Sequence, residues 1–508
     1  MSPKSSIYLV LLVAVVWIIA YDGNLDGGLD LFHEGERLSH FDAIAQGGLP
    51  FRDYYVPHGL GEDVIKPFLA CKLFGVSVAS VRRLGQNSFL YRGWLPPLGA
   101  LSLLLAAASL LRSNRWTTLF AFLLTTGLLE ISERYAFAFF AVGSVGMYLH
   151  SRKWLWLSAA GALSALALLY STETGVYAVV AFSAWLVLNE GIGRSRNSFA
   201  AAIGGFACVF IPFLLWCAWK GIAGDFLQNL YIQIFLRREI WPSKYPAPHW
   251  LPAANTATNV RVFLSVLILF YLIPIVCIAG IVVGWLGKEV VVGLAGCVAG
   301  MFWLTVIGRP DRWHVAYAAG AVYLLVVVSA KMLAANISRK RVVDFVILVL
   351  MLAPLMLYGD GGMLRRKLTG GESPSVPPDL SPHAKDLRQS TLLRAGSIRI
   401  PSSQAQFLES LVGYIQENTG PSDAILDLTN QGLIYFLSNR RSPSRFHYLA
   451  HCDTPGLRKQ FLAEIKNSRP ALVLRPALQP MTQDELDQFV QSHYHRQTTI
   501  GSVEVFIR

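Results

Sequence analysis

The sequence predicts a bundle of about 11 membrane-spanning helices followed by a small α/β domain. Apolar residues make up 53% of the 508 residues and charged residues only 15%, whereas a soluble globular chain carries about 25% charge. The apolar residues gather in long runs up to residue 358, and beyond residue 395 they form short runs between polar stretches. We therefore expect an α-helical polytopic membrane bundle with a small C-terminal extracytoplasmic α/β domain.

A bilayer-spanning helix needs about 20 mostly apolar residues, and this length identifies the individual segments. The first segment is expected to remain as an uncleaved helix, because no clear small-residue cleavage site follows it. The candidate spans cover residues 6–21, 88–111, 117–132, 135–150, 154–170, 176–190, 199–219, 261–286, 290–307, 315–333 and 342–358.

Basic residues between the spans predict the orientation of the chain. Lys4, Arg112, Arg152, Lys288 and Arg339 mark short loops that are basic and contain almost no acidic residues. By the positive-inside rule these loops face the cytoplasm, so the N-terminus is cytoplasmic and the C-terminal domain extracytoplasmic. We expect a multi-pass protein of the inner cell membrane. The formal charge of +12 does not indicate nucleic-acid binding, because the Lys and Arg residues form no single stripe.

The chain is expected to have three parts. Residues 1–358 form a transmembrane module, and its first outer loop covers residues 22–87. Residues 359–394 form a linker, because this stretch includes "GGESPSVPPDLSPH", which is rich in Pro, Gly and Ser. Residues 395–508 form the α/β domain.

Short apolar runs predict the strands of the C-terminal domain. They are "SIRI", "AILDL", "RFHYLA", "ALVLR" and the alternating "GSVEVFIR" at the end of the chain. Helices are expected to begin at Ser402, at Thr454 followed by Pro455, and at a capping box of Thr482 and Glu485.

The first outer loop concentrates titratable residues directly after the first predicted span. The segment "DLFHEGERLSHFDAIAQGGLPFRDYYVPHG" contains Asp30, His33, Glu34, Glu36, Asp42, Asp53 and His58. Glu34 is expected near the bilayer surface, where partial desolvation raises the pKa of a carboxylate toward that of a useful general base. Asp30 and Asp53 are the alternatives for this role. The alternative interpretation of this segment is a solvated loop whose acidic residues only stay out of the membrane.

Two surface helices and a turn are expected in the same loop. The segment "ERLSHFDAIAQ" places Leu38, Phe41 and Ile44 at helical spacing, which favours an amphipathic helix on the membrane surface. The segment "GGLPFRDYY" predicts a turn that presents Arg52 and Asp53. The segment "HGLGEDVIKPFLACKLFG" is typical of a second interfacial helix.

This arrangement resembles the first outer loop of the GT-C superfamily of integral-membrane glycosyltransferases, which includes the protein O-mannosyltransferases and the lipid A aminoarabinose transferase. The family pattern has an acidic pair after the first helix, a surface helix, a "G-x-P-Y/F-x-D" turn and an "H/x-G-P-L"-like element. The matches are His33-Glu34, "GGLPFRD" and "HGL". The plan of many spans before an outer α/β domain is also similar, as is the tail segment "GLIYFLSNRRSPSRF". The sequence departs from the family pattern at His33, because many members have an acidic residue at this position. The base can therefore be Glu34, Asp30 or Asp53.

The resemblance implies an inverting transfer of a sugar from a polyprenyl-phosphate carrier to a hydroxyl group of a glycan, lipid or protein acceptor on the outer face. A carboxylate then removes the proton from the acceptor hydroxyl as it attacks the anomeric carbon. Cations hold the departing lipid phosphate. His33 and His58 are candidate substrate-binding residues. No cofactor is expected, although the chemistry is compatible with a divalent cation. Membrane lipids are further expected partners.

The segment "GRPDRWH" lies at the outer end of two predicted spans. It offers Arg309, Asp311 and His314 as candidate donor-binding residues. Arginines are disfavoured on the outer face by the positive-inside rule, which favours a functional role. The alternative is a polar turn whose arginines extend to the membrane interface.

Further charged residues are candidates for substrate binding. Glu133, Arg134 and Glu173 lie in tight outer hairpins, where ionisable groups tend to face a cavity; the alternative is that they only mark helix ends. Arg237 and Lys244 belong to a basic and aromatic loop that is suited to close over a lipid-phosphate sugar. The alternative for this loop is an interfacial surface helix.

Three other classes of function stay open. A transporter or flippase for lipid-linked glycans would bury charges in the middle of its spans, whereas here the charges gather at outer helix ends. A glycan polymerase or ligase typically relies on arginines in a large late loop. The third class is a non-catalytic envelope-assembly subunit that keeps the GT-C architecture without activity. The presence of His33, where many members have an acidic residue, is compatible with this class.

Overall fold

The chain folds into two compact units. The helical unit comprises Met1–Tyr21, Leu95–Phe213 and Pro242–Pro374, and the mixed unit comprises Asp22–Trp94, Leu214–Trp241 and Ser375–Arg508. The computed structural model describes residues 3–21, 25–85, 95, 97–126, 132–194, 196–236, 240, 267–287, 289–309, 312–336, 386–478 and 484–508.

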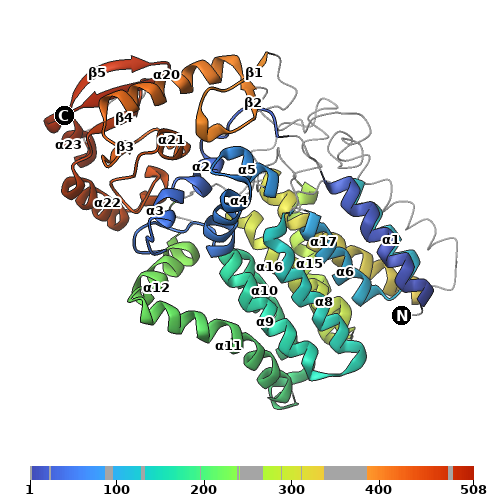
Figure 1. Ribbon diagram of the computed structural model, residues 1–508. Helices are drawn as coiled ribbons and strands as arrows, with labels where there is room; N and C mark the ends of the chain where they lie inside the picture. Colours follow the sequence, from blue (N-terminus) through green and yellow to red (C-terminus); the bar gives the residue numbers. More distant parts are fainter. Residues whose placement is uncertain are drawn as a thin grey trace. The chain divides into compact units, whose positions relative to one another are not determined.

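Helices of the helical unit occupy the predicted spans (Figure 1). The last predicted span, 342–358, lies outside the described residues. The helices are α1 (Pro3–Ala20), α6 (Pro97–Leu111), α7 (Asn114–Thr126), α8 (Ala136–Ser151), α9 (Trp154–Tyr170), α10 (Thr172–Arg194), α11 (Arg196–Trp219), α15 (Ile273–Leu286), α16 (Val290–Gly308) and α17 (Arg312–Asn336), with the short turns η2 (Glu133–Tyr135) and η5 (Leu267–Leu272). The last residues of α11, from Leu214, belong to the mixed unit.

Small residues let neighbouring helices of this unit approach closely. A side chain at Gly284 on α15 would overlap the backbone of Gly293 on α16, and a Cβ at Gly280 would lie 3.5 Å from the Cα of Gly296. Helices in a membrane associate through such close packing, because lipid supplies no hydrophobic drive between them.

Three of the described helical segments are long and apolar enough to cross a membrane, namely Arg196–Trp219, Val290–Gly308 and His314–Ala335. Only 11% of the apolar window in Arg196–Trp219 is buried, so this helix presents apolar side chains outward, as a lipid-facing helix does. The shorter apolar helices fall below the length criterion. A total of about 11 spans therefore stays a prediction.

The first outer loop contains short helices. A single amphipathic helix over residues 36–46 was predicted, and this prediction is wrong, because the chain forms α2 (His33–Leu38) and α3 (Phe41–Ala45). Leu38, Ser39, His40 and Phe41 are all buried. One continuous helix cannot bury four successive residues on a single face, so the chain turns between α2 and α3.

The second predicted helix of the loop is present. The turn η1 (Gly61–Ile65) runs into α4 (Lys66–Phe74), and α5 (Val78–Leu84) follows after a bend of 109°. Ile65, Leu69 and Leu73 are 59%, 46% and 60% exposed. They are spaced four residues apart, so they form one exposed apolar face, as expected for a helix on a membrane surface.

The C-terminal part of the mixed unit contains a four-stranded sheet in the order β3-β4-β6-β5. The pair β3–β4 is parallel, and the other two pairs are antiparallel. The elements are β1 (Leu387–Gln389), η6 (Leu393–Ala395), β2 (Arg399–Pro401), α20 (Ser402–Asn418), β3 (Ile425–Asp427), α21 (Leu433–Ser438), η7 (Leu449–Cys452), α22 (Pro455–Ser468), β4 (Leu472–Pro476), α23 (Glu485–His493), β5 (His495–Ile500) and β6 (Val503–Ile507). The helix α12 (Ala223–Tyr231) and the turn η3 (Ile232–Leu236) also belong to this unit.

Two predictions for this part need correction. The run "RFHYLA" forms no strand: its last two residues, Leu449 and Ala450, lie in the turn η7, and the carbonyl oxygen of Arg445 accepts a hydrogen bond from the backbone N–H of Tyr55 in the first outer loop at 2.9 Å. The helix α23 is capped by Asp484, whose side chain accepts from the N–H of Asp487; Thr482 lies outside the described residues.

Strand β1 lies within the predicted linker 359–394, whose residues up to 385 are not described.

The first outer loop packs directly against the C-terminal part of the mixed unit. The N–H of Leu433 donates to the carbonyl oxygen of Leu31 at 3.1 Å, and the hydroxyl of Tyr448 donates to the carbonyl oxygen of Phe32 at 2.8 Å. A side chain at Gly35 would overlap the Leu433 backbone and the Tyr448 hydroxyl. Glycine is therefore required where α2 meets α21.

Candidate active site

Asp30 and His33 form a hydrogen-bonded pair at the start of α2. The Oδ1 atom of Asp30 accepts from the backbone N–H of His33 at 2.9 Å, and Oδ2 lies 2.8 Å from Nδ1 of the ring. The side chain of His33 is 46% exposed, and that of Asp30 is 13% exposed. The carboxylate therefore orients an imidazole that a substrate can reach.

The two groups shift each other's pKa. Burial raises the pKa of the Asp30 carboxyl, but the hydrogen bond and charge of His33 outweigh it, so this pKa lies below its usual value. Burial lowers the pKa of His33, but the hydrogen bond and charge of Asp30 outweigh it, so this pKa lies above its usual value. An imidazole with a raised pKa, held by a carboxylate, is suited to accept a proton near neutral pH.

Glu34, the predicted base, lies in a buried ion pair with Arg82. Arg82 Nε donates to Oε1 at 2.5 Å and Nη2 donates to Oε2 at 3.0 Å, and both side chains have no exposed surface. Burial raises the pKa of the Glu34 carboxyl, although Arg82 acts in the opposite direction. Glu34 can accept a proton from a substrate only if this pair opens.

Asp53 is held within its own turn. Its Oδ2 accepts from the N–H of Leu49 at 2.7 Å, and its Oδ1 accepts from Arg52 Nε at 3.1 Å. The predicted turn thus presents Arg52 and Asp53 at the surface, with exposed fractions of 50% and 37%. Burial raises the pKa of Asp53, but the hydrogen bond from Arg52 outweighs it, so the carboxylate is ionised at neutral pH.

His58, a predicted substrate-binding residue, lies between two carboxylates. Its Nδ1 is 3.0 Å from Oδ1 of Asp63, and its Nε2 is 4.0 Å from Oε2 of Glu36. His451 approaches the other oxygen of Glu36 at 3.3 Å. The side chain of His58 is only 16% exposed, so the geometry favours a structural role for this ring.

The sequence predicted no specific role for Glu36, Asp63, Arg82 or His451. One signal was available, because buried carboxylates need matching cations. The loop supplies such cations, among them Arg37, which pairs with Glu62 at 2.7 Å, and Arg82. No signal in the sequence could point to His451, because it lies far along the chain in the C-terminal part.

A second titratable cluster lies in the helical unit, where the turn η2 meets the start of α10. Arg134 Nη2 is 3.7 Å from Oε2 of Glu173, and Arg134 Nε donates to Oγ of Ser171 at 3.3 Å. The hydroxyls of Tyr177 and Thr305 donate to Oε1 of Glu173 at 2.9 and 3.1 Å. The structure thus brings together two of the predicted substrate-binding residues, Arg134 and Glu173.

Other predicted residues lie at the same end of these helices. Glu133 accepts from the hydroxyl of Ser132 at 3.1 Å. His314 is buried near the start of α17, with its ring centroid 5.6 Å from that of Tyr317. Arg309 directly follows the last residue of α16. Asp311, Arg237 and Lys244 lie outside the described residues.

Among the residues that the structure describes, no group of three or more His, Cys, Asp or Glu side chains is placed to hold a metal ion.

The chain is similar to several solved structures. ArnT from Cupriavidus metallidurans, solved bound to undecaprenyl phosphate, aligns over 100% of this chain and 98% of its own, with a TM-score of 0.50 and 13% identity. Its apo form aligns over 99% and 98%, with a TM-score of 0.52 and 12% identity. The oligosaccharyltransferase of Archaeoglobus fulgidus aligns over 94% of this chain and 70% of its own, with a TM-score of 0.49 and 12% identity.

These similarities concern the fold. The sequence matches no protein-family model and no curated protein. The resemblance to the GT-C superfamily, predicted from the first outer loop and the plan of the chain, is confirmed at the level of the fold.

Proposed function

We propose that this chain is an inverting glycosyltransferase of the GT-C type, which moves a sugar from a polyprenyl-phosphate carrier to an acceptor hydroxyl. The observation that supports catalysis most directly is the Asp30–His33 pair, a partly exposed imidazole whose orientation and basicity are set by a carboxylate. The carrier is supported by the shared fold with ArnT, which was solved bound to undecaprenyl phosphate.

In the proposed reaction, His33 acts as the base and Asp30 stabilises the protonated ring. The acceptor oxygen gives its proton to His33 and forms a bond to the anomeric carbon of the sugar. The bond from this carbon to the lipid phosphate breaks on the opposite face, so the configuration inverts. The products are the glycosylated acceptor and the polyprenyl phosphate.

Glu34 and Asp53 are less suited to this role than the Asp30–His33 pair. Glu34 has no exposed surface and is bonded twice by Arg82. Asp53 is exposed, but Arg52 and the N–H of Leu49 occupy its carboxylate.

The departing phosphate requires cations, for which Arg134 and Arg309 are the candidates among the described residues. Arginine binds phosphate oxygens through two parallel hydrogen bonds, and fixed charges of this kind stabilise the developing negative charge. Arg237 and Lys244 are proposed to contribute from their loop. Sugar hydroxyls are proposed to contact Glu133, Glu173, Asp311 and His314.

The proposed reaction takes place on the outer face of the inner membrane. The basic loops assign the N-terminus to the cytoplasm, so the first outer loop and the C-terminal part are extracytoplasmic. A glycan, a lipid or a protein on that face supplies the hydroxyl.

The test uses the purified full chain with a panel of radiolabelled polyprenyl-phosphate sugars and cell-envelope acceptors. Wild type, His33→Gln, Glu34→Gln and the control Asp53→Asn are compared after each is shown to be folded. We expect sugar transfer by wild type and Asp53→Asn, and a loss of about 100-fold or more in His33→Gln.

Three results would contradict parts of the proposal. Full activity of folded His33→Gln would assign the base to another residue. Loss of activity in folded Glu34→Gln alone would restore Glu34 as the base. An intact wild type that turns over none of the donors would favour a transporter or an assembly subunit.

A further inference from the structure

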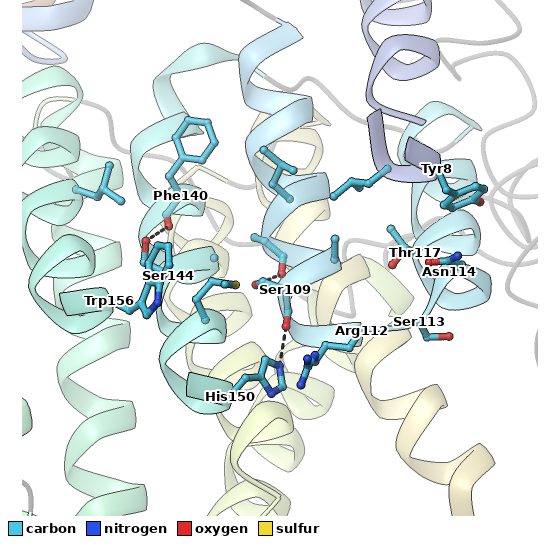
Figure 2. A pocket seen from close by; sticks show the side chains of 17 residues that line it. Tyr8, Ser109, Arg112, Ser113, Asn114, Thr117, Phe140, Ser144, His150 and Trp156 are labelled. Atoms are coloured by element: carbon cyan, nitrogen blue, oxygen red, sulfur yellow. Dashed lines mark hydrogen bonds between the residues drawn. The ribbon is translucent and has the colours of Figure 1, made fainter. Parts of the chain in front are cut away.

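A cavity of about 800 Å³ lies within the helical unit, lined by α1, α6, α7, α8 and α9 (Figure 2). It extends to His150 near the C-terminal end of α8, whereas Glu133 and Arg134 directly precede the N-terminal end of that helix. The helix has 16 residues, so its ends are about 24 Å apart. The cavity is therefore separate from the candidate donor-binding residues.

The walls of the cavity are apolar. Leu105, Phe140 and Leu163 line it. Two hydroxyls in the wall are occupied by their own helices, because Ser109 donates to the carbonyl oxygen of Ala106 at 2.7 Å and Ser144 to that of Phe140 at 3.0 Å. Hydroxyls bonded in this way leave little polarity for a ligand.

The cavity also has an exposed side. Leu105 and Met147, which line it, are 37% and 39% exposed. Gly143 and Ala108 line it as well, and these small residues leave room between the helices. An alkyl chain can therefore enter the cavity from the side of the helices and contact its apolar wall.

One end of the cavity is basic. Figure 2 shows Arg112 and His150 at this end, with Ser113 and Asn114 nearby. The Nε2 atom of His150 lies 2.9 Å from the carbonyl oxygen of Ser109, which fixes the ring. None of the 17 lining residues is acidic, and Arg112 has no carboxylate partner in the part of the chain that the structure describes.

Neighbouring groups add to the positive potential at this end. The helix α7 begins at Asn114, and the free N–H groups of its first turn carry partial positive charge. Lys331 donates to the carbonyl oxygen of Leu111, the last residue of α6. This hydrogen bond places a further cation near the site and neutralises the partial negative charge at the end of α6.

We propose that this cavity binds an anionic glycerophospholipid, with its phosphate at Arg112 and an acyl chain along Leu105, Phe140 and Leu163. Basic pockets between membrane helices on the cytoplasmic side recognise such headgroups, and the basic loops assign this end of the helices to that side. The cavity has the size of an ordinary small-ligand site, which fits a headgroup with part of one chain.

The test measures lipid retention by native mass spectrometry on the purified full chain, with added phosphatidylglycerol, phosphatidylcholine, polyprenyl phosphate or inorganic phosphate. The variants are Arg112→Gln, which removes the charge, and Ala108→Leu, which fills the wall. The matched control is Arg152→Gln. Arg112 and Arg152 both follow a helix end in the left-handed conformation, with φ of 46° and 53°, but only Arg112 lines the cavity.

We expect wild type and Arg152→Gln to retain phosphatidylglycerol in preference to phosphatidylcholine. Affinity should fall at least about tenfold in Arg112→Gln, equivalent to 1.4 kcal/mol, and should also fall in Ala108→Leu. Added phosphatidylglycerol should raise the Tm of wild type but not of Arg112→Gln.

Several outcomes would overturn the proposal. Equal retention of the two phospholipids would exclude recognition of an anionic headgroup. Equal losses in Arg112→Gln and Arg152→Gln would indicate a general effect of surface charge. Preferential retention of polyprenyl phosphate would assign the site to the carrier lipid, and the same Tm rise with inorganic phosphate would show that only an ion binds.

Discussion

Arg82 and Glu34 form a bidentate ion pair whose side chains are both fully buried in the mixed unit. The same guanidinium donates to the carbonyl oxygens of Leu25, Gly27 and Gly28 at 2.7, 3.2 and 2.8 Å. The segment that it holds leads directly into Asp30. The pair therefore positions the backbone on which the candidate base is built.

Removing either partner of this pair should destabilise the mixed unit. Arg82→Ala leaves a buried carboxylate, and Glu34→Ala leaves a buried guanidinium, so each is expected to lower the free energy of unfolding by about 3–5 kcal/mol. The Tm of each purified variant, followed by circular dichroism, measures the effect.

Arg83→Ala is the control for this prediction, because Arg83 is the exposed neighbour of Arg82. Its effect is expected to stay within about 0.5 kcal/mol. The double variant Glu34→Leu with Arg82→Leu should cost less than the sum of the single variants, because it leaves no buried charge. Additive losses would show that the two side chains act independently.

Two buried histidines should make the mixed unit sensitive to acid. Burial lowers the pKa of His40 to about 4 and holds the pKa of His447 well below its usual value. Their ring centroids are 4.9 Å apart, so two charged rings would repel each other. The unfolded chain binds these protons near pH 6.5, so the free energy of unfolding should fall as the pH drops from 7 toward 4.

The variant His40→Phe tests this pH dependence, because it keeps a ring stacked on Tyr54 and removes the titration. The contribution that it removes is up to about 3 kcal/mol at pH 4. Plots of Tm against pH should therefore be shallower for His40→Phe than for wild type. The control His495→Phe, on the exposed strand β5, should give the same slope as wild type. Parallel curves for all three proteins would show that His40 does not take up the proton.

Local patterns in the sequence predicted much of this fold. The apolar runs predicted the helices of the helical unit, and the strands β2, β3, β4 and β6 fall on predicted runs. The turn at Arg52 and Asp53 and the helix α4 were also predicted. Such elements are encoded by periodicity and turn residues within a few positions of each other.

The partners of the titratable residues could not be predicted in the same way. Glu34 was expected at the bilayer surface, but it is buried in an ion pair with Arg82. Local patterns could not reveal this pair, because Arg82 lies 48 residues further along the chain. Glu36 contacts His451 in the C-terminal part. The sequence shows which residues can ionise, whereas the tertiary fold decides which of them are buried and which are reachable.

The pH dependence of transfer should identify Asp30 as the residue that sets the basicity of His33. A base is inactive when protonated, so kcat/KM should fall as the pH drops through the raised pKa of His33. Asp30→Asn removes the negative charge that raises this pKa. The acid limb of the profile should therefore move to lower pH, and the rate at pH 8 should fall about 10- to 100-fold.

Asp53→Asn is the matched control, because it removes a carboxylate from the same loop outside the Asp30–His33 pair. Its profile should follow that of wild type. A lower rate in Asp30→Asn without a shift of the acid limb would mean that Asp30 only maintains the structure of the loop.

Arg134 should contribute to binding of the lipid-phosphate donor beyond its contact with Glu173. Arg134→Gln is expected to raise the KM for the polyprenyl-phosphate sugar about tenfold or more, because the phosphate loses a charge-assisted hydrogen bond. Ser171→Ala, which removes only the 3.3 Å bond to Arg134 Nε, should change the KM much less.

A double variant separates phosphate binding from the pairing of Arg134 with Glu173. If Arg134 only neutralises Glu173, then Arg134→Gln with Glu173→Gln removes both charges and should regain donor affinity. If Arg134 binds the phosphate, the double variant should stay as weak as Arg134→Gln, because no cation has been restored. Tyr177 and Thr305 still bond to the side chain at position 173, so a neutral amide there retains its hydrogen-bond partners and the comparison isolates the charge.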